Sequence, residues 1–377
     1  MDALMLPLNW QRVRLGDICE IVKGQQINKI SLNNTDKYPV INGGIDFLGY
    51  TNKFNVSKNT IAISEGGTCG YVRFMTSNFW SGGHNYSLQK ISNKVNNLCL
   101  YHILKSYEKD IMKLGVGSGL KNIQLKALKD FEILLPPLNE QIAIANILSG
   151  LDRYLCALDA LILKKEGVKK ALSFELLSQR KRLKGFNQAW QRVRLGDIGK
   201  PCMCKRVMKH QTTRYGEIPF YKIGTFGNTA DAFISKKLFL EYKTKYSFPK
   251  KGDILISASG TIGRAVIYDG KPAYFQDSNI VWIDNDETLV KNDFLFYAYS
   301  HVKWNTEHTT ILRLYNDNFR NTLIPLPPLN EQSTIANILS GLDSEIISLK
   351  NKKRQFENIK KALNHDLMSA KIRVLNK

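Results

Sequence analysis

Residues 135–141 read LPPLNEQ and residues 145–152 read ANILSGLD, and both strings occur a second time in the same order, at residues 326–332 and 336–343. Upstream, WQRVRLGDI also occurs twice, at residues 10–18 and 190–198. The offset is 326 − 135 = 191 at one end and 190 − 10 = 180 at the other, so the second copy is 191 − 180 = 11 residues longer. The chain is therefore two copies of one unit.

After each Pro-Pro pair, mostly apolar residues recur at three- and four-residue steps, which is the pattern of a heptad seam. The seam positions are Leu148, Leu151, Leu155, Leu158, Ile162, Lys165, Lys169, Leu172 and Leu176, then Leu339, Leu342, Ile346, Leu349, Lys353, Phe356, Lys360, Leu363 and Leu367. A helix of about 45 residues would be roughly 65 Å long, too long to be buried by one small globule. We expect the helices of residues 139–187 and 330–377 to form an antiparallel coiled coil with an approximate two-fold axis. The alternatives are packing on each helix's own globule or pairing with a second copy.

Residues 1–138 and 188–329 mix short β-rich runs, glycine-rich turns and short helical segments, which predicts an α+β fold for each. Their interiors have diverged, although a common skeleton survives in ISEGGTCG at residues 63–70 and ISASGTIG at residues 256–263. A common skeleton with different surface residues suggests that the two regions recognise two different targets.

The charge of the chain favours a polyanionic partner. Among its 377 residues, 54 Lys and Arg against 33 Asp and Glu give a formal net charge of +21, and nucleic acid is the first candidate. The start does not resemble a secretory signal and no apolar run has the ~18 residues of a membrane span. We therefore expect a cytoplasmic protein without a membrane partner, and six cysteines in the free thiol state.

This arrangement, a variable α+β region followed by LPPLNEQ and a long heptad helix, then all of it again, closely resembles the DNA-specificity (S) subunit of type I restriction-modification systems. The resemblance covers the full chain. It implies target recognition domains at residues 1–138 and 188–329, and conserved helices at residues 139–187 and 330–377. Each domain would read one half of a bipartite site in double-stranded DNA, and the coiled coil would set the unread gap.

The resemblance also implies that this chain is non-catalytic and works with partners. Two methyltransferase subunits would dock on the duplicated frame, and restriction subunits with ATP-driven translocase activity would complete the complex. The chain itself would need no cofactor, whereas its partners would use S-adenosylmethionine, ATP and Mg. The positions expected to bind partners are Pro136, Pro137, Asn139, Glu140 and Gln141, with Pro327, Pro328, Asn330, Glu331 and Gln332.

Residues able to contact DNA are candidates because Lys and Arg bind phosphate and guanine, and Asn and Gln bind adenine. In the first variable region they are Lys23, Gln25, Gln26, Thr68, Arg73, Ser118, Lys121 and Asn122. In the second they are Lys205, Arg206, Lys209, Gln211, Arg214, Thr261, Arg264 and Arg313. We expect roughly half of them to miss the interface, because a loop lysine is usually only solvated.

No catalytic or metal site is predicted. The sequence lacks an Asp-Pro-Pro-Tyr or Asn-Pro-Pro-Tyr string and a Gly-x-x-x-x-Gly-Lys-Ser/Thr loop, and its six histidines do not have ligand spacing. Two rival interpretations are kept. One is a nucleic-acid scaffold that ignores sequence, and the other is an enzyme in its own right.

Overall fold

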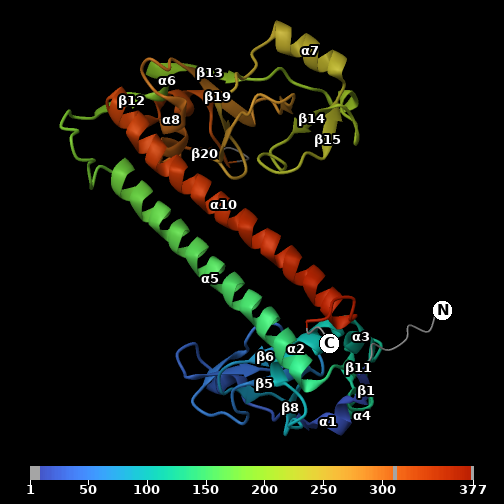
Figure 1. Ribbon diagram of the computed structural model, residues 1–377. Coiled ribbons are helices and arrows are strands. Elements are labelled where there is room, and N and C mark those ends of the chain that lie inside the picture. The colour runs from blue at the N-terminus through green and yellow to red at the C-terminus, as the bar shows by residue number, and fades with distance from the viewer. Residues whose placement is uncertain (1–8, 309–311, 375–377) are drawn as a thin grey trace. The chain divides into compact units, whose positions relative to one another are not determined.

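The computed structural model describes residues 9–308 and 312–374. The chain forms two compact units (Figure 1). Unit 1 comprises Met1–Ala160 with Lys350–Lys377, and unit 2 comprises Leu161–Leu349. Each unit holds one α+β globule and a stretch of both long helices, which confirms the predicted fold class and its internal repeat.

The globule of unit 1 is built around a four-stranded antiparallel sheet. Its spatial order is β2 (Glu20–Lys23), β8 (Asn85–Gln89), β5 (Thr60–Ser64) and β6 (Val72–Met75). The central strand β5 is covered on both faces, because Ile61 and Ile63 enter the main core and Ala62 packs with Met75 and Phe79 on the other face. This double burial explains why residues 61–63 are apolar without alternation.

Smaller sheets and short helices surround this sheet. The strands are β4 (Gly49–Thr51), β3 (Tyr38–Ile41) and β7 (Trp80–Ser81) in one sheet, with the pairs β1 (Gln11–Arg14) and β11 (Glu132–Leu135), and β9 (Gly115–Val116) and β10 (Asn122–Ile123). The helices are α1 (Leu15–Ile18), η1 (Lys29–Ser31), α2 (Asn97–Ser106), α3 (Glu108–Lys113) and α4 (Leu125–Lys129). Asn96 caps α2 by accepting a hydrogen bond from the backbone N–H of Cys99 at 3.0 Å, as expected for an N-cap residue.

Unit 2 repeats this topology. Its four-stranded sheet has the order β13 (Gly199–Met203), β19 (Ile280–Asn285), β16 (Ile254–Ser257) and β17 (Ala265–Ile267). A three-stranded sheet has the order β15 (Ala232–Ile234), β14 (Ile218–Tyr221) and β18 (Tyr274–Phe275). Two further sheets are the pairs β12 (Gln191–Arg194) with β22 (Leu323–Leu326) and β20 (Glu307–His308) with β21 (Leu312–Arg313). Its helices are α6 (Leu195–Ile198), η2 (Lys209–Gln211), α7 (Lys236–Lys245), α8 (Asn292–Tyr299) and α9 (Asn316–Asn321). The extra length of the second copy lies between β15 and β16, where α7 has no counterpart between β4 and β5.

Two long helices, α5 (Leu138–Leu177) and α10 (Leu329–Met368), run unbroken through Gly150 and Gly341. In unit 1 the Nζ of Lys353 lies 2.7 Å from Asp159, and Lys360 pairs with Asp152. In unit 2 Lys165 lies 2.8 Å from Glu345, and Lys169 lies 2.5 Å from Asp343. Partner numbers rise along one helix as they fall along the other, so the helices pair antiparallel within the chain, as predicted.

The long helices are joined to the globules by shared cores and polar contacts. In unit 1, Leu148 of α5 and Leu367 of α10 belong to the same core as Ile61 of the globule. In unit 2 the carboxylate of Asp343 binds Lys169 of α5 and also accepts a 2.8 Å hydrogen bond from the hydroxyl of Tyr297 on α8. Each globule is therefore anchored to both helices of its unit.

Helix α5 ends at Leu177, earlier than the predicted boundary at residue 187. The physical reason is a turn at Gln179, whose φ of 61° is left-handed and cannot continue an α-helix. Ala370 has a φ of 51° just after α10 ends at Met368, so both helices stop in the same way. The residues that follow each turn reach back to the start of the partner helix.

Candidate nucleic-acid interface

Five segments of unit 1 converge into a group that we call loop cluster 1, defined as residues 23–26, 42–44, 65–68, 82–85 and 117–122. Backbone hydrogen bonds tie these segments together. The N–H of Gly24 donates to Asn85 at 2.8 Å, that of Thr68 to Gly43 at 2.8 Å, and that of Glu65 to His84 at 3.0 Å. Loop cluster 1 therefore lies at the ends of several strands, and backbone hydrogen bonds hold its loops together.

Glycine permits this close approach of backbones. A Cβ atom at Gly24 would lie 2.2 Å from the carbonyl oxygen of Gly82, and one at Gly43, whose φ is +80°, would lie 2.6 Å from the carbonyl oxygen of Gly66. Both distances are shorter than any real contact, so side chains at these positions would push the loops apart. The glycine-rich strings noted in the sequence are thus structural requirements of the cluster.

The structure brings most candidates of the first region together. Those in loop cluster 1 are Lys23, Gln25, Gln26, Thr68, Ser118, Lys121 and Asn122. All are exposed except Thr68, which is half-buried. Arg73 lies apart on β6, where its guanidinium carbon is 4.9 Å from the ring centre of Phe47 and 5.4 Å from that of Tyr71. These contacts make Arg73 a packed side chain on the sheet.

Glu65 is a residue of loop cluster 1 that sequence reasoning did not select. Its side chain is only 10% exposed, and its Oε1 accepts hydrogen bonds from Lys23 at 2.7 Å and from the hydroxyl of Tyr86 at 3.1 Å. Burial, with the nearby Glu65 carboxylate, raises the pKa of Tyr86 to about 12. A charged residue between a buried strand and Gly66-Gly67 was the signal that could have identified it.

Unit 2 contains an equivalent group, loop cluster 2, defined as residues 205–206, 222–225, 258–261, 276–279 and 313. The same backbone frame holds it. The N–H of Ala258 donates to Asn279 at 2.8 Å, and the N–H of Leu314 donates to Ala258 at 2.8 Å. In unit 1, Glu65 makes the matching bonds, donating to His84 and accepting from Ile123 at 2.9 Å.

The candidates of the second region divide into two groups. Arg206, Thr261 and Arg313 lie in loop cluster 2, as does Lys205, although the Nζ of Lys205 is turned toward the ring of Tyr246 at 5.0 Å. The others lie outside the cluster as defined, namely Lys209 and Gln211 on η2, Arg214 after it and Arg264 beside Gly227.

Asp277, Ser278 and Asn279 complete loop cluster 2 and were not selected from the sequence. Asp277 accepts a 2.8 Å hydrogen bond from the Nε of Arg206, and Asn279 accepts one of 2.8 Å from the hydroxyl of Ser259. Ser278 has a φ of 53°, a conformation that non-glycine residues rarely adopt outside functional or tightly constrained loops. A polar QDSN run between two apolar strands was the available signal.

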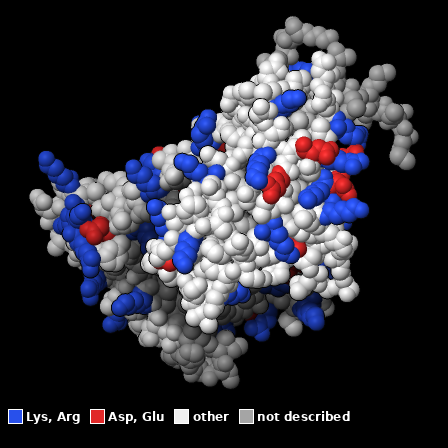
Figure 2. All heavy atoms as spheres, turned by 90° about the horizontal axis from the view of Figure 1, so that it is seen from below, with Lys and Arg blue, Asp and Glu red and all other residues white. Residues whose placement is uncertain are grey.

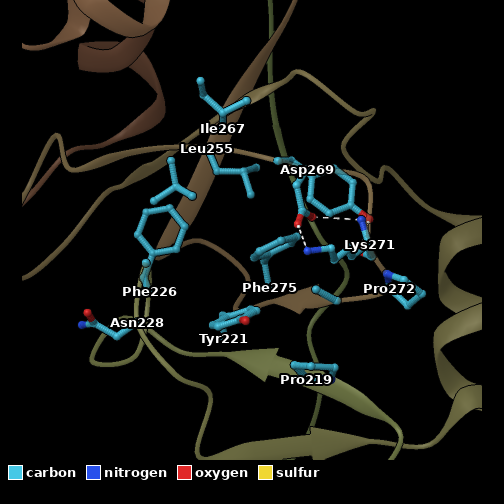
Figure 3. A pocket seen from close by; sticks show the side chains of 14 residues that line it. Pro219, Tyr221, Phe226, Asn228, Leu255, Ile267, Asp269, Lys271, Pro272 and Phe275 are labelled. Atoms are coloured by element: carbon cyan, nitrogen blue, oxygen red, sulfur yellow. Dashed lines mark hydrogen bonds and ion pairs between the residues drawn. The ribbon is translucent and has the colours of Figure 1, made fainter. Parts of the chain in front are cut away.

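A pocket of about 410 Å³ lies beside this cluster in unit 2 (Figure 3). Tyr221 and Phe275, the last residues of β14 and β18, stack at its wall with ring centres 5.9 Å apart. At its edge Asp269 and Lys271 form an ion pair at 3.2 Å. Because the lining is mainly aromatic and apolar and this pair is mutually neutralised, the pocket suits binding of an apolar or aromatic group more than acid–base chemistry.

The electrostatics agree with a polyanionic ligand. On the face drawn in Figure 2, basic side chains are spread widely and acidic side chains occupy fewer places. Within the part of the chain that is described, there is no group of three or more His, Cys, Asp or Glu side chains placed to hold a metal ion. None of the described helices combines the length and the apolar character needed to cross a membrane.

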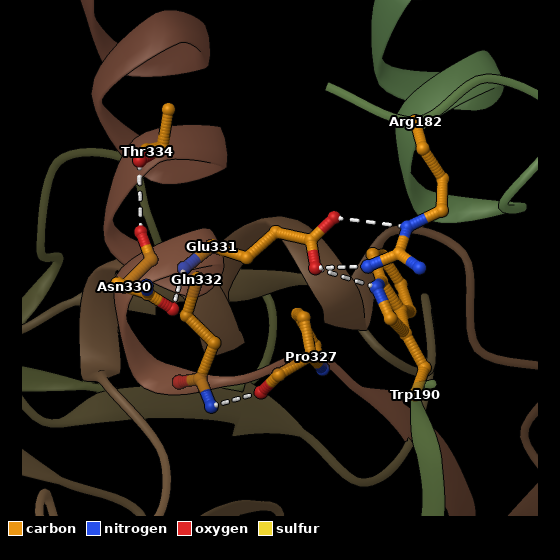
Figure 4. Close-up of polar contacts among 7 residues, drawn as sticks. All are labelled: Arg182, Trp190, Pro327, Asn330, Glu331, Gln332 and Thr334. Carbon is orange, nitrogen blue, oxygen red and sulfur yellow. Dashed lines mark hydrogen bonds and ion pairs between the residues drawn. The ribbon is translucent and has the colours of Figure 1, made fainter. Parts of the chain in front are cut away.

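The repeated LPPLNEQ motif makes internal contacts, which Figure 4 shows for the second copy. The Glu331 carboxylate, 1% exposed, accepts hydrogen bonds from Arg182 at 2.7 Å and from the indole N–H of Trp190 at 2.9 Å. The Gln332 amide donates to the carbonyl oxygens of Pro327 at 2.8 Å and Leu289 at 3.0 Å. The motif thus connects α10, the segment after α5 and the globule of unit 2.

Unit 1 contains the same arrangement. Glu140 accepts hydrogen bonds from Arg373 at 2.7 Å and from Trp10 at 3.2 Å, and Gln141 donates to Pro136 at 2.7 Å. The prolines Pro136 and Pro327 are buried, Pro137 and Pro328 are half-buried, and Asn139 and Asn330 are exposed. The buried motif side chains have a structural role, and binding of partner subunits at these ten positions stays a prediction.

A basic chain with two different loop clusters, each in a unit that includes a stretch of both long helices, has the features expected of a nucleic-acid-binding protein with two non-identical recognition domains. The model of the type I restriction modification DNA specificity domain matches residues 7–165 and 187–358. The chain belongs to this family, whose function is DNA sequence specificity.

Individual proteins agree with this assignment. A candidate type I restriction enzyme specificity subunit of Haemophilus influenzae is 40% identical over 324 residues, which are 81% of each chain. The crystal structure of a type I restriction-modification S subunit from M. genitalium is 23% identical, covers 97% of each chain and has a TM-score of 0.70. A chain from a structural study of complex assembly in the type I R-M system has a TM-score of 0.52 at 15% identity, covering 96% of this chain and 98% of that one. The last two likenesses concern the fold alone.

Proposed function

We propose that this chain reads an asymmetric, two-part site in double-stranded DNA, one half with each target recognition domain. The observation that supports the proposal is the pair of loop clusters, which share a backbone frame but differ in the side chains they present. Glu65 in loop cluster 1 stands where Ala258 stands in loop cluster 2, with matching backbone hydrogen bonds. The matching backbone hydrogen bonds fit one kind of ligand bound by both loop clusters. The different side chains fit recognition of two different base sequences.

The chain acts without an active site of its own and recruits enzymes. Two methyltransferase subunits dock against the repeated frame and present one adenine on each strand for methylation, and restriction subunits complete the complex. S-adenosylmethionine, ATP and Mg belong to those partners. Membership of the type I restriction-modification specificity family, and the similarity to a candidate type I restriction enzyme specificity subunit, support this role in an assembly.

The direct test is to map methylated adenines in cells that express this chain with its methyltransferase partner. We expect one bipartite motif, and replacement of residues 8–138 by another variable region should change only one half of it. Methylation without a sequence motif would favour the sequence-independent scaffold. Methyl transfer or cleavage by the purified chain alone would instead show an enzyme.

A second test concerns the gap between the halves. Inserting one heptad into each long helix, at positions that pair with one another, should preserve the seam and lengthen only the unread gap. A change in the bases that are read, with the gap unchanged, would contradict the proposal that the paired helices set the spacing.

A further inference from the structure

Arg206 is held by a carboxylate at the surface of loop cluster 2. Its Nε lies 2.8 Å from Oδ2 of Asp277, whose side chain is 16% exposed, whereas 67% of the Arg206 side chain is exposed. Among the described residues, Asp277 is the only ion-pair partner of this arginine. Because only Nε is engaged in this ion pair and most of the side chain is exposed, the donors of the two terminal nitrogens are left for another acceptor.

The carboxylate is itself placed by a constrained loop. Asp277 precedes Ser278, whose φ of 53° is left-handed, and the carbonyl oxygen of Ser278 accepts a hydrogen bond from Arg313. Asn279, next along, is held by the hydroxyl of Ser259 at 2.8 Å. Contacts of the two residues that follow Asp277 therefore restrict the position of the carboxylate before any ligand arrives.

We propose that Arg206 reads a guanine in the half-site of the second target recognition domain, and that Asp277 is its positioning residue. The inference rests on the proposed function and deepens it. Two parallel N–H donors of an arginine match the O6 and N7 acceptors of guanine in the major groove, and no other base presents that pair of acceptors. An arginine whose Nε is already bound presents this fork with fewer rotamers to lose on binding.

The first domain contains a related pair with different chemistry. Lys23, 54% exposed, lies 2.7 Å from Glu65, which is 10% exposed. A lysine ammonium can also donate to guanine, but it is a point charge without a planar fork, so its donors are not fixed in one geometry. Of these two pairs, only the one in unit 2 therefore presents an oriented planar fork.

The experiment measures the methylated motif, position by position, for the full chain in cells with its methyltransferase partner. Arg206→Ala should lower the preference for guanine at one position by roughly 5- to 150-fold, since a bidentate pair supplies discrimination of that size. Arg206→Lys should lower it by a smaller factor, because lysine can donate to guanine but has no planar fork. Arg206→Lys retains the charge and should keep DNA affinity closer to the native level. Asp277→Asn should lower the preference at the same position by a smaller factor, while the other half-site stays unchanged.

The matched control is Asp284→Asn, because Asp284 on β19 also pairs with a basic side chain, Lys250, at 3.0 Å in the same domain. It should leave the motif as it is. If Arg206→Ala retains guanine at every position, or if Asp277→Asn lowers thermal stability without changing the motif, the inference is overturned and the pair is only structural. A native chain that directs no sequence-specific methylation would overturn the proposed function, and the inference with it.

Discussion

Glu331→Gln should destabilise unit 2 by about 2–3 kcal/mol. The side chain is 1% exposed and its carboxylate accepts hydrogen bonds from both Arg182 and Trp190. Hydrogen bonds to charged groups contribute roughly 1.5–3 kcal/mol, and breaking a buried ion pair costs roughly 3–5 kcal/mol. Arg182 is 29% exposed, so water replaces part of what it loses and the expected cost falls toward the lower end.

The assay is denaturant unfolding of the full chain, monitored by tryptophan fluorescence because Trp190 contacts Glu331. Glu140→Gln should have a similar effect in unit 1, where Arg373 and Trp10 bind the equivalent carboxylate. Glu345→Gln is the control, since this residue is 45% exposed and its pair should contribute less than about 1 kcal/mol. Equal losses for Glu331→Gln and Glu345→Gln would refute the argument from burial.

Three further predictions concern pH, helix stability and loop packing. Burial lowers the pKa of His102 to about 4. Below pH 6.5 this imidazole therefore binds a proton more readily in the unfolded chain than in the folded one. Stability should fall from pH 7 to pH 5 by up to roughly 2 kcal/mol and less in His102→Gln, and equal pH slopes in unfolding experiments would be contrary to this reasoning. A Cβ at Gly150 meets no heavy atom within 4 Å, so Gly150→Ala should raise the unfolding free energy by about 1 kcal/mol, and a lower melting temperature would count against it. Gly24→Ala should disrupt loop cluster 1, because its Cβ would lie 2.2 Å from the carbonyl oxygen of Gly82, whereas a Cβ at Gly119 meets no heavy atom within 4 Å. DNA binding should therefore weaken in Gly24→Ala and stay unchanged in Gly119→Ala. Native DNA affinity in Gly24→Ala would disprove the packing argument.

The sequence predicted the fold class and the long helices of this molecule. Heptad steps identify which residues of α5 and α10 face a partner, and Leu148, Leu158 and Leu367 are indeed buried. The candidate DNA-contacting residues stay a prediction. Because they were chosen for their chemical type, they include Arg73, which packs against Phe47 and Tyr71, and omit Asp277, whose contact with Arg206 joins residues distant in sequence.

By itself, the sequence determined the duplication, the α+β character of both globules, the two long heptad helices and the basic charge. These properties follow from local periodicity, composition and self-similarity, all of which can be read along the chain. Only the tertiary structure decided that Glu140 and Glu331 are buried ion-pair centres and that five separate segments form each loop cluster. Such contacts join residues far apart in sequence, and whether a charged group is buried or exposed depends on neighbours that only folding brings together.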